Sequence, residues 1–154
     1  MEAVVFCGVQ GSGKTTLYVD RFLETHVRVS LDVLRTRARE EAFLRLCLER
    51  GQRFVVDNTN ATAAERRGYV EPARAAGFRV VGYLVEVDVA EALARNAERA
   101  GRRRVPTAGV VGTDRRLVRP TPEEGFDELW HATAARGGGW RIDPLLVTRP
   151  LFEA

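Results

Sequence analysis

Short apolar runs along the chain alternate with longer segments in which apolar residues recur at helical spacing. The apolar runs predict five strands, at residues 3–7, 27–29, 53–57, 78–87 and about 126–132. The amphipathic segments predict four helices, at about 14–24, 30–50, 62–76 and 89–100. Because strands and helices alternate, we expect a single α/β domain over residues 1–154, with three layers and a central, mostly parallel sheet of about four to five strands.

Glycine and proline positions refine the boundaries of these elements. Gly51, Gly77 and Gly101 are expected to close the second, third and fourth helices. Pro72 lies inside the third helix, where its missing N–H predicts a kink or a break. The stretch that follows Gly101 predicts a basic loop with room for one short helix. The tail, about 136–154, contains three consecutive glycines and is expected to form a hairpin or to lie on the sheet edge.

Composition narrows the class of protein. With 45% hydrophobic and 29% charged residues, the chain has the make-up of a soluble domain that buries a single core. Since it has no apolar run of membrane-spanning length and no signal peptide pattern, we expect a cytoplasmic protein without a membrane partner. Cys7 and Cys47 are too few and too far apart for a metal site, so reduced thiols are expected. With only His26 and His131, a zinc or histidine-triad enzyme is not expected.

The only lysine of the chain, Lys14, lies in the octet Gly8–Thr15, which fits the phosphate-binding loop pattern G-x-x-x-x-G-K-[ST]. The other 23 basic residues are arginines, so blind placement would put the lysine here about one time in 24. A general bias toward arginine explains the other positions but not this one. A phosphate loop needs a compact ammonium at the β- and γ-phosphates, where a planar guanidinium would not fit. The octet therefore predicts nucleotide binding, with Lys14 also acting in catalysis.

The phosphate loop also predicts how ATP and Mg²⁺ are bound. Backbone N–H groups of the loop should surround the β-phosphate at the positive end of the following helix. The residues expected to bind ATP are Gly11, Ser12, Gly13, Lys14, Thr15, Thr16, Arg95 and Arg99. Thr15 and Asp57, the last residue of the third strand, are the expected Mg²⁺ ligands, with Asp57 acting through a water. The alternative for Asp57 is an Asx-turn cap, but a phosphate-loop enzyme requires such an acid.

Two further pairs of charged residues suggest phosphoryl transfer. Asp32 and Arg35 are three apart at a helix start, where a carboxylate can deprotonate an acceptor hydroxyl while the guanidinium binds its phosphate. A plain N-cap with an ion pair explains this spacing equally well. Arg95 and Arg99 are four apart on one helix face and could close over the γ-phosphate, although most such pairs are simply solvated.

The charge of the chain is unevenly distributed. The net charge is +3, yet the segment 95–119 holds eight arginines against Glu98 and Asp114. This segment is expected to form an arginine-rich lid, a solvated surface or an electrostatic footprint for phosphates. In the acceptor channel, nucleic acid would need an open, positive groove, whereas a small metabolite would need a closed pocket. The positive charge of this segment favours nucleic acid, but only weakly, because ATP also attracts positive charge.

The motifs also occur in a familiar order. They are Gly8–Thr15, Asp32-x-x-Arg35, Val55–Asn60, Arg95-Asn96-x-x-Arg99, Val105-Pro106 and Pro120–Phe126. Over about residues 3–130 this set resembles polynucleotide 5′-hydroxyl kinases and the kinase domain of polynucleotide kinase–phosphatases. The resemblance implies a P-loop kinase that uses Mg²⁺-ATP on the 5′-OH end of DNA or RNA. It also implies that Asp32 is the general base, that Arg35 contacts the acceptor's 3′-phosphate and that Arg99 contacts the ATP phosphates.

Several positions depart from the family pattern. Gln10 replaces the usual proline, Ser30-Leu31 replaces a charged pair before Asp32, and the spacing from Arg99 to Val105 is one residue longer than in the phage enzyme. The chain lacks an Asp-x-Asp-Gly phosphatase motif, so any 3′-phosphatase would be a separate chain. These departures leave two alternatives open: a kinase of a metabolite, nucleoside or antibiotic, and a regulatory ATPase without an acceptor.

Overall fold

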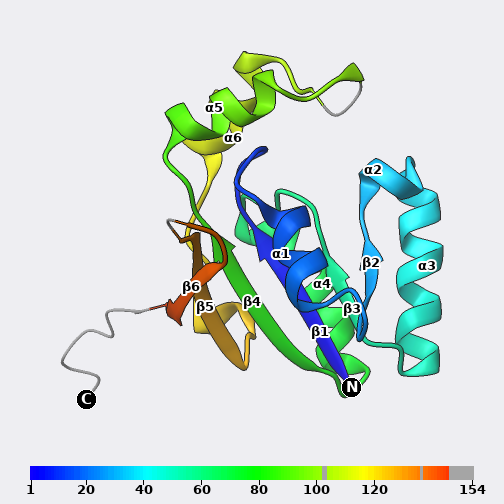
Figure 1. Cartoon of the computed structure of the whole chain (residues 1–154). Coiled ribbons are helices and arrows are strands. Elements are labelled where there is room, and N and C mark those ends of the chain that lie inside the picture. Colours follow the sequence, from blue (N-terminus) through cyan, green and yellow to red (C-terminus); the bar gives the residue numbers. More distant parts are fainter. Residues whose placement is uncertain (102–103, 136, 146–154) are drawn as a thin grey trace.

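A six-stranded sheet forms the centre of the protein, with the strand order β2-β3-β1-β4-β5-β6 (Figure 1). The computed structural model describes residues 1–101, 104–135 and 137–145. The strands are β1 (Glu2–Cys7), β2 (Val27–Val29), β3 (Phe54–Val56), β4 (Arg79–Val85), β5 (Glu128–Ala134) and β6 (Trp140–Pro144). The helices are α1 (Lys14–Arg21), α2 (Leu31–Leu34), α3 (Arg37–Arg50), α4 (Ala63–Ala75), α5 (Val89–Ala97) and α6 (Thr107–Arg116), with a 3-10 turn, η2, at Pro122–Glu124. The first five strands are parallel, as expected.

Alternate residues of the central strand β1 face opposite sides of the sheet. Ala3 and Val5 pack in a buried cluster with side chains of α3 and α4. Val4 and Phe6 pack in a second cluster with side chains of α1. Both faces of β1 are therefore covered, which explains why the strand is a continuous apolar run and confirms the three-layer α/β fold.

The sheet has one strand more than expected, because the tail contributes β6. This strand pairs antiparallel with β5, from Trp130 opposite Pro144 to Ala134 opposite Trp140. The tail therefore forms a hairpin and also occupies the sheet edge, so the two expected arrangements occur together. Residues 136 and 146–154 of the expected tail lie outside the described residues.

The single helix expected over residues 30–50 is two helices. Ser30 caps α2, since its side chain accepts from the backbone N–H of Asp32. Arg35 then has a left-handed backbone, with φ of 74°, and ends the helix. Thr36 caps α3 by accepting from the N–H of Arg39. The expected helix is divided because a second N-cap, Thr36, follows Ser30 after six residues. The apolar patterns of α2 and α3 follow one another so closely that the sequence suggested one continuous helix.

The other helix boundaries differ from expectation in both directions. Helix α4 runs through Pro72 without a break, because the proline lies in the last turn and removes a single hydrogen bond there. Helix α5 ends at Ala97, three residues early, and the expected basic loop contains the ten-residue helix α6. None of the helices in the described ranges is long and apolar enough to cross a membrane.

A fully buried arginine joins α4 to the segment before β5. Arg66 donates from Nε and Nη2 to the carboxylate of Glu124, at 2.7 and 3.1 Å. Its Nη1 donates to the backbone oxygen of Asn60 at 2.8 Å, and the Asn60 side chain donates to the backbone oxygen of Phe6. This network fixes the turn after β3 against the end of β1. It gives the Pro120–Phe126 motif a structural role.

Candidate active site

The carboxyl ends of β1, β2 and β3 meet at one edge of the sheet, beside a cavity of about 610 Å³. Parallel strands place their ligand sites at this edge. The cavity walls come from the phosphate loop, the start of α1, α2 and α3, the turn after β3, and α4. Arg99 and Val105, which lie between α5 and α6, and Arg116 of α6 complete the lining. The residues expected to bind ATP or Mg²⁺ or to act in catalysis that line it are Gly11, Lys14, Thr15, Asp32, Asp57 and Arg99.

Two glycines of the phosphate loop allow other elements to approach it closely. Gly11 and Gly13 have positive φ angles of 81° and 100°. A Cβ atom on Gly11 would lie 2.6 Å from the backbone oxygen of Ala92 in α5. A Cβ atom on Gly13 would lie 2.9 Å from the ring of Trp140 in β6. The glycine pattern of the motif therefore serves both the loop conformation and its packing against α5 and β6.

Lys14 folds back onto the loop. Its Nζ donates to the backbone oxygens of Gly8 at 2.9 Å and Val9 at 2.8 Å. The pKa of Lys14 is lowered to about 8, mainly by burial; Asp57 opposes this shift and the nearby Arg99 contributes to it. The site thus holds a desolvated ammonium that a phosphate would stabilise in its charged form.

Thr15 and Asp57 are in direct contact. The Thr15 hydroxyl donates to Oδ2 of Asp57 at 2.9 Å, so a hydroxyl and a buried carboxylate share one wall of the cavity. These oxygen groups are the kind of donors that Mg²⁺ prefers, and they fit the expected metal role. Arg28 of β2 was not expected at this place. Its Nε donates to Oδ2 of Asp57 at 2.7 Å and its Nη2 to the Thr15 hydroxyl at 3.3 Å.

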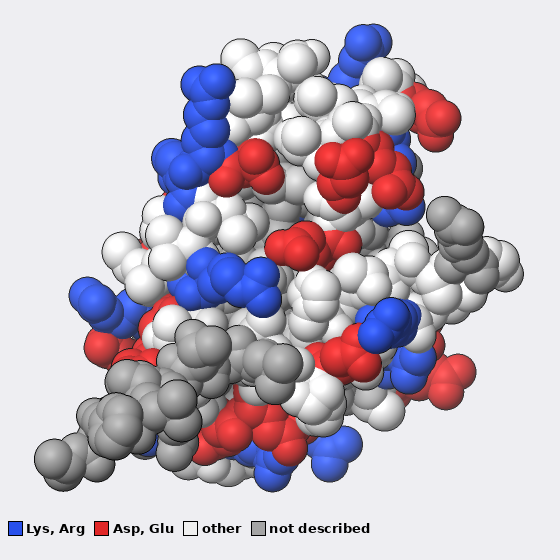
Figure 2. All heavy atoms as spheres, turned by 90° about the vertical axis from the view of Figure 1, so that its left-hand side faces the viewer, with Lys and Arg blue, Asp and Glu red and all other residues white. Residues whose placement is uncertain are grey.

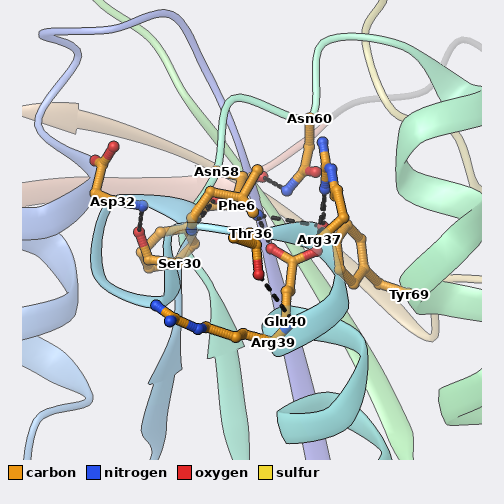
Figure 3. A network of polar contacts seen from close by, with 11 residues as sticks. Phe6, Ser30, Asp32, Thr36, Arg37, Arg39, Glu40, Asn58, Asn60 and Tyr69 are labelled. Atoms are coloured by element: carbon orange, nitrogen blue, oxygen red, sulfur yellow. Dashed lines mark hydrogen bonds and ion pairs between the residues drawn. The ribbon is translucent and has the colours of Figure 1, made fainter.

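Asp32 and Arg35 are separated by the end of α2. Asp32 is exposed on the cavity wall (Figure 3). Arg35 is also exposed, but among the described residues it does not belong to the cavity lining, whereas Arg37 does. The left-handed conformation of Arg35 ends the shared helix face that the spacing suggested. Arg35 and Arg37, only two residues apart, therefore differ in their access to the site.

A buried carboxylate forms the wall beside Asp32. Glu40 accepts from the Tyr69 hydroxyl at 2.6 Å, from Nδ2 of Asn58 at 2.9 Å and from Nη1 of Arg37 at 3.0 Å (Figure 3). Oδ1 of Asn58 accepts from the N–H of Leu31, the residue before Asp32. The network thus connects α3 and α4 to the start of α2, which carries Asp32.

Burial in this wall changes the pKa of Tyr69. Burial and the adjacent Glu40 carboxylate raise the pKa of Tyr69 to about 12, so its hydroxyl stays a donor. Glu40, Tyr69 and Arg37 were not predicted from the sequence. One signal was present: Glu40, Leu44 and Cys47 recur at helical spacing and are the buried residues of α3. A glutamate on such a stripe indicates a buried polar network.

The pair α5–α6 packs against the phosphate loop. Val9 of the loop, Ala92 of α5 and Val110 of α6 form one buried apolar cluster. The side chain of Asn96 accepts a hydrogen bond from the backbone N–H of Val105 and donates one to its backbone oxygen. These bonds join α5 to the residues just before α6. Arg95 donates to the backbone oxygen of Gly11 at 3.4 Å, next to the ATP-binding loop. Of the remaining expected ATP ligands, Thr16 is exposed in the first turn of α1, and Ser12 is buried.

Several arginines of the segment 95–119 are paired with carboxylates. Arg95 contacts Glu91, Arg116 contacts Glu65 and Arg119 contacts Glu86. On the face shown in Figure 2, Lys and Arg side chains are interspersed with Asp and Glu. The local excess of positive charge in the sequence is thus partly compensated by acids from other segments. Arg102 and Arg103 lie outside the described residues.

Several known proteins are similar to this chain in sequence or in fold. A bifunctional polynucleotide phosphatase/kinase of Schizosaccharomyces pombe is 28% identical over 134 residues, which cover 83% of this chain and 32% of the relative. The chain therefore spans about a third of the length of that curated relative. Kti12 of Chaetomium thermophilum, solved in complex with ADP-AlF3, matches with a TM-score of 0.64 and 19% identity, over 85% of this chain and 88% of Kti12. A gluconokinase from Sinorhizobium meliloti 1021 matches with a TM-score of 0.58 and 18% identity, over 88% and 83% of the two chains.

These solved structures share the P-loop kinase fold with the chain, and this fold supports ATP-dependent phosphoryl transfer. A family model described as AAA domain matches residues 35–120, more than half of the sequence. The match begins at Arg35 and includes the Glu40 network, the turn after β3 and the pair α5–α6. The chain belongs to the AAA domain family and is one of its members with a P-loop kinase fold.

Proposed function

We propose that this chain is a kinase that transfers the γ-phosphate of ATP to the 5′-OH end of DNA or RNA. The observation that carries the proposal is that the Asp32 carboxylate borders the same cavity as Lys14 and the Thr15–Asp57 pair. A general base, a phosphate-binding ammonium and a metal-binding oxygen pair are thus available to one reacting group. The similarity to the polynucleotide phosphatase/kinase of Schizosaccharomyces pombe supports a polynucleotide as the acceptor.

The donor side of the reaction uses the loop and α1. The N–H groups of residues 11–14 surround the β-phosphate, and Lys14 leaves the oxygens of Gly8 and Val9 to contact the β- and γ-phosphates. Thr15 and Asp57 would hold Mg²⁺, which would supply positive charge against the phosphates. Arg99 stabilises the charge on the transferring group.

The acceptor side uses α2 and α3. Asp32 takes the proton of the attacking hydroxyl and holds that oxygen in line with the γ-phosphate. Arg37, rather than the expected Arg35, contacts a phosphate of the acceptor. Its Nη1 is held by Glu40 and Tyr69, while within the described residues Nε and Nη2 make no hydrogen bond. These two nitrogens form the edge of a guanidinium that binds phosphate with paired hydrogen bonds.

A second candidate is a kinase of a small hydroxyl compound, and the charge of the cavity favours it. The charged lining residues are Asp32, Glu40, Glu41, Asp57, Glu65, Lys14, Arg37, Arg99 and Arg116. Acidic residues outnumber basic residues by five to four, whereas nucleic acid favours a positive surface. A neutral sugar or nucleoside would tolerate such a lining.

One experiment separates the candidates. Wild-type protein is incubated with Mg²⁺ and γ-labelled ATP together with a 5′-OH oligonucleotide, the same oligonucleotide with a 5′-phosphate, a nucleoside or gluconate. Label on the 5′-OH strand alone is the expected result. Label on the nucleoside or gluconate, with none on the strand, would favour the small-molecule kinase. Release of labelled phosphate with no labelled acceptor would support a regulatory ATPase instead.

A further inference from the structure

The side chain of Gln10 connects the phosphate loop to α6. Its Nε2 donates to Oγ1 of Thr113 at 3.2 Å. The Thr113 hydroxyl donates its own hydrogen to the backbone oxygen of Gly109 at 2.9 Å, so Oγ1 must accept from Gln10. This fixes the orientation of the amide and directs its Oε1 into a buried place, where it has no partner among the described residues. The bond joins residues 103 positions apart, between the loop and the helix that faces it.

The contact lies at the centre of the packing between the loop and α6. Val9, beside Gln10, belongs to the same buried cluster as Val110, one turn before Thr113. Thr113 itself is buried, although it is polar. One turn further along α6, Arg116 lines the cavity and donates to Glu65 of α4 at 3.1 Å. The position of Arg116 therefore depends on how α6 sits on the loop.

We infer that Gln10 is a positioning residue that fixes α6 on the phosphate loop and thereby places Arg116 at the cavity. A proline, which the resembled family has at this position, has no side-chain donor for Thr113. The contact is thus a property of this chain. The hydrogen bond adds a directional contact between the phosphate loop and α6, where the packing of Val9, Ala92 and Val110 is apolar and has no preferred direction.

Hydrogen exchange of the substrate-free protein tests this inference without reference to any reaction. The variants are Gln10→Met, Thr113→Val and the double variant, with Thr107→Val, an exposed position of the same helix, as the control. Thr113→Val keeps the shape of the side chain and removes its hydroxyl. We expect amides of residues 107–116 to exchange about tenfold faster in both single variants, the effect of losing one hydrogen bond. The double variant should exchange no faster than either single variant, and the control should match wild type.

Three results would overturn the inference. Unchanged exchange in α6 of the Thr113→Val variant would mean that the bond does not hold the helix. Faster exchange throughout β1, β3 and β4 would mean that the residue only stabilises the domain. Fully additive effects of the two substitutions would mean that they do not act on one contact.

The consequence for catalysis rests on the proposed function. With the acceptor identified, Thr113→Val should lower kcat about fivefold to tenfold and leave the KM for ATP within about twofold. A changed KM for ATP with unchanged kcat would contradict a role in positioning Arg116. If wild-type protein transfers phosphate to none of the acceptors, the proposed function fails, while the exchange measurement still decides the role of Gln10.

Discussion

Arg28 donates to the same Asp57 oxygen that accepts the Thr15 hydroxyl, at 2.7 and 2.9 Å respectively. The side chain of Asp57 is only 2% exposed, so its charge needs a partner. Arg28 provides that partner beside the oxygen pair proposed to hold Mg²⁺. A protein cation and the metal would therefore compete for one carboxylate.

The first prediction concerns Arg28→Met. Loss of the guanidinium leaves the buried Asp57 carboxylate without its ion-pair partner, so without Mg²⁺ the free energy of unfolding should fall by about 2–4 kcal/mol. Mg²⁺ should then raise the melting temperature of the variant more than that of wild type, because the metal replaces the lost cation. Thermal unfolding with and without Mg²⁺ measures both effects. Arg53→Met, an exposed neighbour, is the control; equal Mg²⁺ shifts in the two variants would contradict a shared carboxylate.

The second prediction uses the single lysine of the chain. Selective ¹³C labelling of lysine gives one signal, which should titrate near pH 8 in nucleotide-free protein instead of near the ordinary value of 10.5. Between these values the unfolded chain binds more protons than the folded one, so the free energy of unfolding should rise with pH. Below about pH 8 the lysine is protonated in both states and the full penalty of burying its charge applies. Titration near 10.5 would show that the ammonium is not desolvated.

Binding of ATP should move the same signal in the other direction. Phosphate charge next to Lys14 favours the ammonium, so its pKa should rise when ATP binds. An unchanged titration in saturating ATP would contradict contact between Lys14 and the phosphates. Mg²⁺ alone, at the same concentration, serves as the control.

The third prediction separates the two arginines near Asp32. Arg37→Gln should raise the KM for the acceptor by about 10-fold to 100-fold, the effect of losing a charge-assisted pair of hydrogen bonds. Arg35→Gln should change it by about twofold or less, because Arg35 is not part of the described cavity lining. Steady-state kinetics with a phosphate-bearing acceptor measure both. A larger effect at Arg35 than at Arg37 would restore the role that the family resemblance implies.

The fourth prediction concerns the buried Arg66–Glu124 pair. Arg66→Met should lower the free energy of unfolding by about 3–5 kcal/mol, because it leaves the Glu124 carboxylate without its partner. Adding Glu124→Leu should recover part of this loss, since the double variant buries no lone charge. Denaturant unfolding measures both, and Arg67→Met, whose side chain is largely exposed, should change stability by about 0.5 kcal/mol or less. Equal stabilities for Arg66→Met and wild type would contradict the structural role of the Pro120–Phe126 motif.

The sequence predicted the elements whose signal is local. Buried strands such as β1 are continuous apolar runs, and the phosphate loop has a fixed spacing around Lys14. The division between α2 and α3 was not predicted, because Thr36 restarts the helix within two residues of the end of α2. Helix α6 was expected only as a short helix within a basic loop. The charged residues of this segment dominate its composition, and the burial of Val110 against Val9 and Ala92 is a contact between distant segments.

The site was predicted in part for the same reason. Lys14, Thr15 and Asp57 follow strands or lie in a motif, so topology brings them together. Arg28, Glu40 and the Gln10–Thr113 contact depend on pairs far apart in the chain. Most residues of these pairs carry no local signal, since a lone polar or charged residue is usually solvated. Glu40 is the exception, because it shares a helical stripe with the buried Leu44 and Cys47.

Transfer of label from γ-labelled ATP to a 5′-OH oligonucleotide, by wild type and by Asp32→Asn, tests the central claim most directly. The substitution keeps the size of the side chain and removes the base. We predict a labelled 5′ end with wild type, no label on a 5′-phosphorylated control strand, and a rate lower by about 100-fold or more with Asp32→Asn at unchanged ATP affinity. Equal labelling by both proteins, or no labelling by wild type, would contradict the claim.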